Sequence, residues 1–270
     1  MKNFKILKLI LLIIAFINTY DGFSQIDIDF FPRRTQNLNQ YTSVFICSPN
    51  NGTIIQNIHN DDDQEIWFNS DKFQYYNNGW VYLAEETPTT TMEPGRGYVL
   101  QLGGNGNYSA NITDNRTFDF SGGSANTGII TGPNLTANQF NLLGNPYNNF
   151  LDLDLFLLSS NNKTKVKGPI MLWSHNTLLS NANVNPNDPN VYVNSANDFA
   201  LYNVLGGVAA GRQISTSPDN PEANTGIQTP NGKICMGTGF GVYSIGNGSI
   251  IYDDSMRTAS NGGETQSFRM

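Results

Sequence analysis

An acidic stretch holds the densest group of potential metal ligands in the chain. The segment HNDDDQE, residues 59–65, places carboxylate and amide oxygens close together. Calcium takes several oxygen ligands of these kinds, so the segment is a candidate calcium loop. It lacks the Asp-x-Asx-x-Asx-Gly spacing of an EF-hand, and a solvated acidic turn is the simpler interpretation. The candidate ligands are Asn60, Asp61, Asp62, Asp63 and Glu65.

A weaker calcium candidate is the pair Asp152 and Asp154 in FNLLGNPYNNFLDLDLF, residues 140–156. Pro146 cannot donate to a strand ladder, so the first strand must end there and the Gly-Asn-Pro stretch predicts a sheet corner. Asp152 is predicted to cap a short helix or turn, and an alternating Asp-Leu strand is the alternative. In the helical form the residues expected to pack inward are Leu155, Phe156 and Leu158.

Catalytic constellations are weak, and we expect no enzyme. Ser174 and His175 are adjacent, so in a strand their side chains would point to opposite faces, and no Gly-x-Ser-x-Gly motif exists. The two histidines, His59 and His175, and the two cysteines are too far apart in sequence for a zinc cluster. Carboxylate pairs for glycoside hydrolysis need a defined separation that sequence does not give. The available acids lie at 61–65, 85–86, 152, 154 and 253–254.

Two Gly-x-Gly motifs resemble phosphate loops but lack their context. Gly95-x-Gly97 and Gly237-x-Gly239 each lead into a predicted strand, whereas anion binding needs a helix N-terminus. Close backbone approach inside a sheet explains them better.

Aromatic side chains could instead bind sugar by stacking, although core packing is the simpler interpretation. Strand alternation puts Tyr75 and Tyr76 on opposite faces, which leaves one of them free for the surface. The candidates are Trp67, Trp80, Trp173, Tyr75, Tyr76 and Tyr82.

The elements around these residues read as strands. Short runs rich in β-branched and aromatic residues are bounded by Asn, Gly, Pro or Asp, and Asn77-Asn78-Gly79 predicts a hairpin within residues 75–83. We therefore expect an all-β protein with at most short helices. The expected strands are 42–47, 65–69, 72–76, 80–84, 97–102 and 116–120.

Four motifs recur in the same order and predict a duplication. FICSPNN matches LLGNPYNN, IWFN matches MLWSHN, DKFQYYNNGW matches NDFALYNVLGG, and GRGYVLQL matches GTGFGVYS. Repeats of this length are typical of two pseudo-symmetric antiparallel β units packed as a sandwich. The expected divisions are a signal peptide (1–24), an extended lead-in (25–40), unit 1 (41–120), a linker or hairpin (121–139), unit 2 (140–257) and a flexible tail (258–270).

The N-terminus predicts export. Lys2, Lys5 and Lys8 precede the apolar run 9–17, and cleavage after Ser24 fits a secretory signal peptide. The run is too short to span a bilayer comfortably, so we expect no transmembrane segment after cleavage. The formal net charge of −7 and the lack of a basic cluster argue against nucleic acid as a partner.

Cys47 and Cys235 are the two cysteines. An exported chain permits a disulfide between them, and two buried thiols are the alternative.

Several segments together resemble a known family. They are FNLLGNPYNNFLDLDLF, PIMLWSHNT, NDFALYNVLGG, CMGTGFGVYS and IIYDDSMR. They look like a β-rich module of large secreted Bacteroidetes proteins, which commonly lies just upstream of a C-terminal sorting domain of the type IX secretion system. The resemblance implies an exported, often adhesin-like protein and no catalytic residues. Because the family usually continues past a following Phe-Arg and this sequence stops at TQSFRM, we expect a fragment or a short stand-alone version.

Taken together, the sequence predicts an exported, non-enzymatic β module with an adhesive or structural role. We expect it to be secreted or on the cell surface, or in the periplasm if no outer-membrane export signal is present. Its partner would be a surface protein or a glycan. The alternative is a carbohydrate-binding or glycan-processing module. Exposed aromatics would favour glycan binding, whereas three buried tryptophans would favour a structural role.

Overall fold

Antiparallel strands form most of the regular structure of the chain, which confirms the all-β prediction. Among the described residues, the strands form six antiparallel sheets, accompanied by one short α-helix and one 3-10 turn. In this part of the chain no helix is long and apolar enough to cross a membrane. The computed structural model describes residues 25–28, 42–55, 58–60, 73–83, 90–102, 116–120, 123–173, 199–210 and 229–258.

The first large sheet contains the predicted hairpin, which is confirmed. Asn78 and Gly79 adopt positive φ angles of 56° and 150°, a backbone region open to Asn and Gly at low cost. The amide of Asn77 donates to the carbonyl oxygen of Gly79 at 2.9 Å, and the flanking strands pair in antiparallel register. The strand order is β2 (Thr42–Ile46), β7 (Tyr98–Leu102), β5 (Phe73–Tyr76) and β6 (Trp80–Tyr82).

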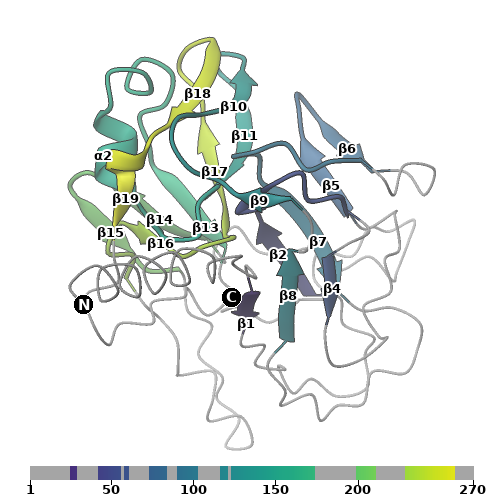
Figure 1. Ribbon diagram of the computed structural model, residues 1–270. Helices are drawn as coiled ribbons and strands as arrows, with labels where there is room; N and C mark the ends of the chain where they lie inside the picture. The colour runs from purple at the N-terminus through teal and green to yellow at the C-terminus, as the bar shows by residue number, and fades with distance from the viewer. Residues whose placement is uncertain are drawn as a thin grey trace, which may run out of the picture.

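The second large sheet has five strands and a clear division between its two faces. Along β14 the burial alternates, so that Ala200 and Tyr202 are buried while their neighbours are half-buried. Such alternation is expected when one face of an antiparallel sheet packs on a core. The strand order is β11 (Phe140–Gly144), β17 (Gly239–Tyr243), β13 (Ile170–Trp173), β14 (Phe199–Asn203) and β15 (Gly206–Val208). Figure 1 shows this sheet beside the first one.

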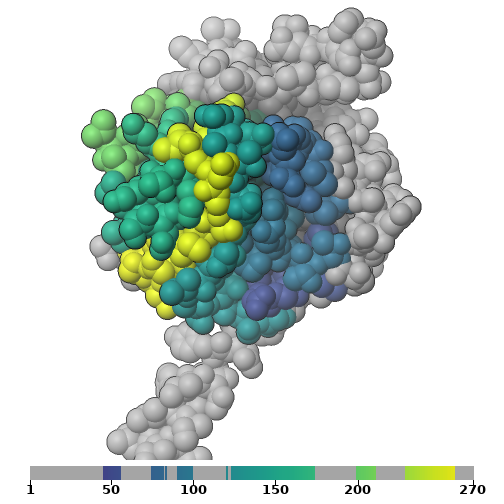
Figure 2. All heavy atoms as spheres, turned by 90° about the horizontal axis from the view of Figure 1, so that it is seen from above, coloured from purple at the N-terminus to yellow at the C-terminus, as the bar shows by residue number. Residues whose placement is uncertain are grey.

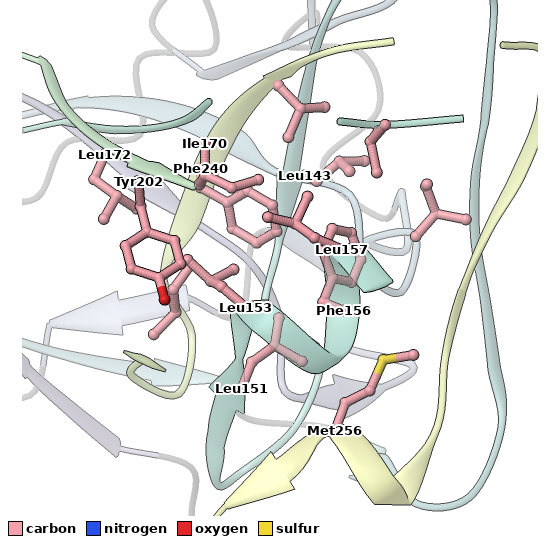
Figure 3. Packing of buried hydrophobic residues seen from close by; sticks show 14 of the residues in the cluster. Leu143, Leu151, Leu153, Phe156, Leu157, Ile170, Leu172, Tyr202, Phe240 and Met256 are labelled. Carbon is pink, nitrogen blue, oxygen red and sulfur yellow. The ribbon is translucent and has the colours of Figure 1, made fainter. Parts of the chain in front are cut away.

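The main core lies between the second sheet and helix α2 (Leu153–Leu158). Phe156 stacks on Tyr252 with ring centroids 5.4 Å apart and meets Phe240 edge-on at 5.8 Å. Figure 3 shows helix and sheet side chains converging in this cluster, with Met256 closing it at one side. All the buried residues of this cluster belong to residues 130–256, so the first sheet contributes none of its described side chains to it.

Helix α2 confirms the predicted cap and corrects the predicted packing. Asp152 accepts hydrogen bonds from the amides of Asp154 and Leu155, as an N-cap does. However, Leu155 and Leu158 are exposed, contrary to the prediction that they pack inward. The helix starts at Leu153, and the i, i+3, i+4 spacing then turns a different set toward the core. The buried members are Leu153, Phe156 and Leu157.

The two large sheets meet at a corner where they exchange backbone hydrogen bonds reciprocally. The amide of Cys47, after β2, donates to the carbonyl of Gly237 ahead of β17 at 2.8 Å. The amide of Gly144, at the end of β11, donates to the carbonyl of Gly95 ahead of β7 at 3.1 Å. Each sheet therefore bonds to the Gly-x-Gly segment of the other. The corresponding bridges pair Ile46 with Thr238 and Arg96 with Leu143.

Glycine is required at this corner because the backbones approach closely. A Cβ on Gly97 would overlap the carbonyl oxygen of Leu143, and one on Gly239 would lie 3.0 Å from the carbonyl carbon of Phe45. The close approach expected from the two Gly-x-Gly motifs is thus confirmed, and it joins two sheets rather than strands of a single sheet.

Smaller sheets complete the fold. The expected lead-in contains β1 (Gln25–Ile28), which pairs with β8 (Arg116–Phe120), and β8 also pairs with β4 (Ile58–Asn60). The segment expected as a linker or hairpin contains β9 (Ser124–Ala125) and β10 (Ile130–Leu135), which pair with distant strands. Those partners are β3 (Asn50–Asn51) and β18 (Gly248–Tyr252). A three-stranded sheet follows the order β16 (Lys233–Ile234), β12 (Phe150–Asp152) and β19 (Arg257–Thr258).

Most predicted strand boundaries agree with the observed ones to within one or two residues, and 116–120 agrees at both ends. The predicted strand 65–69 lies outside the described residues.

Candidate functional site

The first calcium candidate falls almost wholly outside the described part of the chain. Asn60 ends strand β4, where its backbone pairs with Phe118 and its side chain is not described. Asp61, Asp62, Asp63 and Glu65 lie outside the described residues. The calcium loop therefore stays a prediction.

The second candidate pair has structural partners. The carboxylate of Asp152 caps α2, and the carboxylate of Asp154 accepts a hydrogen bond of 2.9 Å from the hydroxyl of Tyr202. Burial, reinforced by this carboxylate, raises the pKa of Tyr202 to about 12. Tyr202 therefore stays protonated and acts as the donor. The hydrogen bond between Tyr202 and Asp154 therefore connects strand β14 to helix α2.

The other described carboxylates also serve local structure. Asp253 accepts from the amide of Ser255 and caps the 3-10 turn Asp254–Met256. Asp254 accepts from Arg257 at 2.8 Å and from the amide of Gly128 at 3.1 Å. The hydrogen bond from Arg257 holds the pKa of Asp254 below its ordinary value. Among the described residues no three His, Cys, Asp or Glu side chains gather as metal ligands.

The Gly-Asn-Pro stretch forms the turn after β11, where the sequence predicted that the strand would end. Asn145 is fully buried, and its side-chain amide donates to the carbonyls of Asn149 at 2.7 Å and Ile234 at 3.1 Å. Its side-chain oxygen accepts from the amide of Tyr147 at 3.0 Å. A buried amide that satisfies this many backbone groups fixes the turn after β11.

The two cysteines are described, whereas the side chains of both histidines are not. His59 lies in β4, where only its backbone is described, and Ser174 and His175 lie outside the described residues. Both cysteines are free thiols rather than a disulfide. Burial raises the pKa of Cys47 and raises that of Cys235 to about 12, which keeps both protonated and poorly nucleophilic at neutral pH.

The two described tryptophans differ clearly in exposure. Trp173 is 5% exposed and packs against Phe45 and Phe199, whereas Trp80 is 47% exposed on strand β6. Trp67 lies outside the described residues. The structure therefore places one candidate sugar-stacking residue in a core and another at the surface.

Trp80 begins a continuous line of rings that crosses from the first sheet to the second. Trp80 contacts Tyr76 on β5 at 5.3 Å between ring centroids, Tyr76 contacts Phe140 on β11 at 5.1 Å, and Phe140 contacts Tyr243 on β17 at 5.9 Å. All three contacts are edge-to-face, the arrangement that aromatic pairs prefer. We call Trp80, Tyr76, Phe140 and Tyr243 the aromatic row.

The two outer rings of the aromatic row are exposed to solvent, and the two middle rings are packed against other side chains. Tyr243 is 56% exposed, and Tyr76 and Phe140 are half-buried against a small cluster that includes Phe45 and Leu142. The Phe140 ring lies over Gly241, where a Cβ would come within 2.8 Å of it. Figure 2 shows blue atoms from the first sheet directly against teal atoms from the middle of the chain. The middle rings are therefore held in place by packing while the outer rings meet solvent.

Tyr75 and Tyr76 lie on opposite faces, as strand alternation predicted, but both are half-buried rather than one being free at the surface. Tyr76 joins the aromatic row, while Tyr75 lies on the opposite face, where the Arg96 guanidinium sits 4.7 Å from its ring centroid. Tyr82 is in β6, and its side chain is not described. The sequence did not single out Phe140 or Tyr243, because each reads as an ordinary strand residue until β11 pairs with β17 and Phe140 comes opposite Tyr243.

The aromatic row is flanked by uncharged residues. Within two positions of each of its members, the sequence contains only aliphatic, aromatic, glycine, amide and hydroxyl residues. Asn77 and Asn78 form the turn next to Trp80, and Gln139 and Ser244 adjoin the other end. The sequence neighbours of the row thus combine apolar rings with neutral polar groups, of which Ser244 is buried. The bridge of Val166 with Ser244 also brings the exposed Lys167 near the Tyr243 end.

The comparisons with known proteins identify a family without assigning an activity. No curated protein and no solved structure matched the chain. A family model described as a domain of unknown function (DUF8693) matches residues 30–270, which is most of the chain. This chain therefore belongs to the DUF8693 family.

Proposed function

We propose that this chain is an exported, non-enzymatic module that acts at the cell surface or outside the cell by adhesive contact. The observation that carries the proposal is the aromatic row, because large apolar rings left exposed on a folded domain mark an interaction surface. The signal-peptide pattern of residues 1–24 supports export.

The chemistry of the described side chains favours binding over catalysis. Every described carboxylate has a helix cap, an ion pair or a tyrosine hydroxyl as its partner. Both thiols are protonated by burial. A general acid or nucleophile would need a group with a pKa tuned toward neutrality in an open site.

An origin by duplication fits this role. The reciprocal hydrogen bonds of Cys47 and Gly144 with the opposite Gly-x-Gly segments support two equivalent units. The aromatic row then lies across both units, with Trp80 and Tyr76 from one and Phe140 and Tyr243 from the other. The resemblance to β-rich modules of secreted Bacteroidetes proteins is part of the same proposal.

Two measurements on the full chain test the proposal. The chain is expressed with its own N-terminal segment in a diderm bacterium, and the N-terminus of the exported product is determined by mass spectrometry. We expect a chain beginning at Gln25 in the periplasm or the medium. Retention of the whole chain in the cytoplasm would overturn export.

The second measurement is attachment. Beads coated with the exported chain are applied to surfaces carrying polysaccharides or extracellular proteins, beside beads carrying the double variant Trp80→Ala, Tyr243→Ala. We expect attachment to at least one surface, and its loss in the double variant. A matched control is Ile129→Ala, which removes an exposed apolar side chain outside the aromatic row. Attachment to no surface, or equal attachment by the double variant, would overturn the adhesive role.

A further inference from the structure

The aromatic row has the features of a surface for an extended neutral ligand. Its rings contact one another at centroid distances of 5.3, 5.1 and 5.9 Å, so the four rings form one connected set rather than isolated side chains. The two outer rings are the most exposed, at 47% and 56%. A ligand that lies along the row would therefore meet a ring at each end.

The available area argues against a folded protein as the occupant. Aromatic side chains contribute about 150–250 Å² each when fully covered. With two rings about half exposed and two mostly covered, the row offers roughly 300–400 Å². A specific protein–protein interface takes about 800 Å² from each partner. The rings alone would thus supply at most about half of one partner's share of a stable protein interface, whereas they suffice for a short stretch of a polymer.

The polar surroundings select the chemistry of that polymer. Phosphorylated or acidic ligands call for arginine or lysine, and within two positions of each ring of the aromatic row the sequence has neither. An exposed lysine, Lys167, adjoins the Val166–Ser244 bridge at the Tyr243 end, and the alginate probe below tests its influence. The flanking amides at the surface both donate and accept: Asn77 and Asn78 are exposed, and Gln139 is half-buried. A pyranose presents a C–H face to an aromatic ring and neutral hydroxyls at its edge, so it satisfies both kinds of group.

Preorganisation adds to the argument. Edge-to-face contacts and the packing of Phe140 over Gly241 hold the middle rings in place. Asn141, next to Phe140, is buried and donates to the hydroxyl of Ser244 at 3.1 Å, which links β11 to the residue after Tyr243. The middle rings then lose little side-chain freedom when a ligand lies along the row, which favours binding to a weakly interacting sugar chain.

We infer that the aromatic row binds a neutral polysaccharide, with Trp80 and Tyr243 stacking on sugar rings at its two ends. This inference rests on the proposed function and names the ligand class for the same surface. A second copy of this chain and an apolar protein segment are the competing occupants.

The test is native affinity electrophoresis of the exported full chain in gels containing one polysaccharide each. The neutral probes are mixed-linkage glucan, xylan and galactomannan, and the acidic probe is alginate. We expect retardation by at least one neutral probe. Trp80→Ala and Tyr243→Ala should each weaken the dissociation constant about tenfold or more, as truncation of a binding hot spot does.

Conservative and remote variants separate stacking from folding. Tyr243→Phe keeps the ring and should keep binding, while Ile129→Ala should bind as the unmodified chain does. Trp80 also gives a direct signal, since sugar stacking on an exposed indole shifts its fluorescence. That shift should appear in the unmodified chain and disappear in Trp80→Phe, whose remaining tryptophans report any change in the fold.

The other outcomes overturn the inference. Retardation only by alginate would show that charge rather than stacking selects the ligand. Sedimentation that reveals a dimer abolished by Trp80→Ala would identify a second copy as the occupant. Bead attachment to protein-coated surfaces without retardation by any polysaccharide would remove the sugar ligand and leave the adhesive function standing. Failure of both assays would remove both.

Discussion

The two large sheets share a corner and differ in what covers them. At the end of one strand in each sheet, a backbone amide donates to the Gly-x-Gly segment that precedes a strand of the other sheet. The donors are Cys47 and Gly144. The second sheet buries one face under α2 in a cluster whose members all lie within residues 130–256. The described buried side chains of the first sheet include Phe45 and Val99, which pack with Leu142 and Trp173 of the second. The second sheet therefore packs under α2, while the first packs Phe45 and Val99 against the second and carries Trp80 at the surface.

The largest expected effect on stability comes from the core between the second sheet and α2. Phe156→Ala removes a fully buried ring that contacts Tyr252 and Phe240, and should lower the free energy of unfolding by about 3–5 kcal/mol. Phe45→Ala should cost less, because some of its aromatic neighbours are only half-buried and can adjust. Urea titration of both variants measures the difference. Equal losses would mean that the two regions share one core energetically.

Next come the glycines at the corner. Gly97→Ala and Gly239→Ala occupy equivalent places, and each added methyl meets backbone of the opposite sheet. Overpacking of this kind costs about 1–3 kcal/mol, and Gly97→Ala should cost more because its overlap is the closer one. Thermal unfolding of the two variants side by side provides the measurement. If Gly97→Ala left the melting temperature unchanged, the two sheets could move apart at this corner without loss of stability.

Removing the N-cap of α2 should have a smaller effect on stability, which arises in the part of the fold that contains the second sheet. Asp152→Ala leaves two amides of α2 without their acceptor and should destabilise the chain by about 1 kcal/mol. Asp152→Asn retains a capping oxygen and serves as the control. Denaturant midpoints of the two variants should therefore differ. If both lose the same stability, the charge rather than the cap is the important feature.

The smallest expected effect is a loss of thermal stability at acidic pH. Hydrogen bonding to Arg257 lowers the pKa of Asp254 in the folded chain, so its contribution is present above the unfolded-state pKa and is lost as pH falls through the folded value. Melting temperatures should fall from neutral pH to about pH 3, below the ordinary aspartate pKa of about 3.9. Asp254→Asn should reduce that fall slightly, because the group is exposed. An unchanged pH profile would assign the acid sensitivity to other carboxylates.

Local signals in the sequence were enough for the strands and turns. Asn78 and Gly79 tolerate the positive φ that the hairpin needs, and Pro146 ends β11 because it has no amide to donate. Asp152 was recognisable as a cap because a short acceptor side chain preceded an apolar run. Each of these depends on a residue and its near neighbours, which the sequence contains.

Which residues face the core and which meet across sheets depended on tertiary structure. The inward face of α2 was mispredicted, because the i, i+3, i+4 spacing counted from Leu153 turns Leu155 and Leu158 to solvent. Phe140 and Tyr243 lie more than a hundred positions apart in sequence and come together only through the register of β11 with β17. Sequence alone determined the β class, the turns and the uncharged flanks of the rings. The corner and the aromatic row were decided by long-range strand pairing, since no local propensity specifies which strands become neighbours.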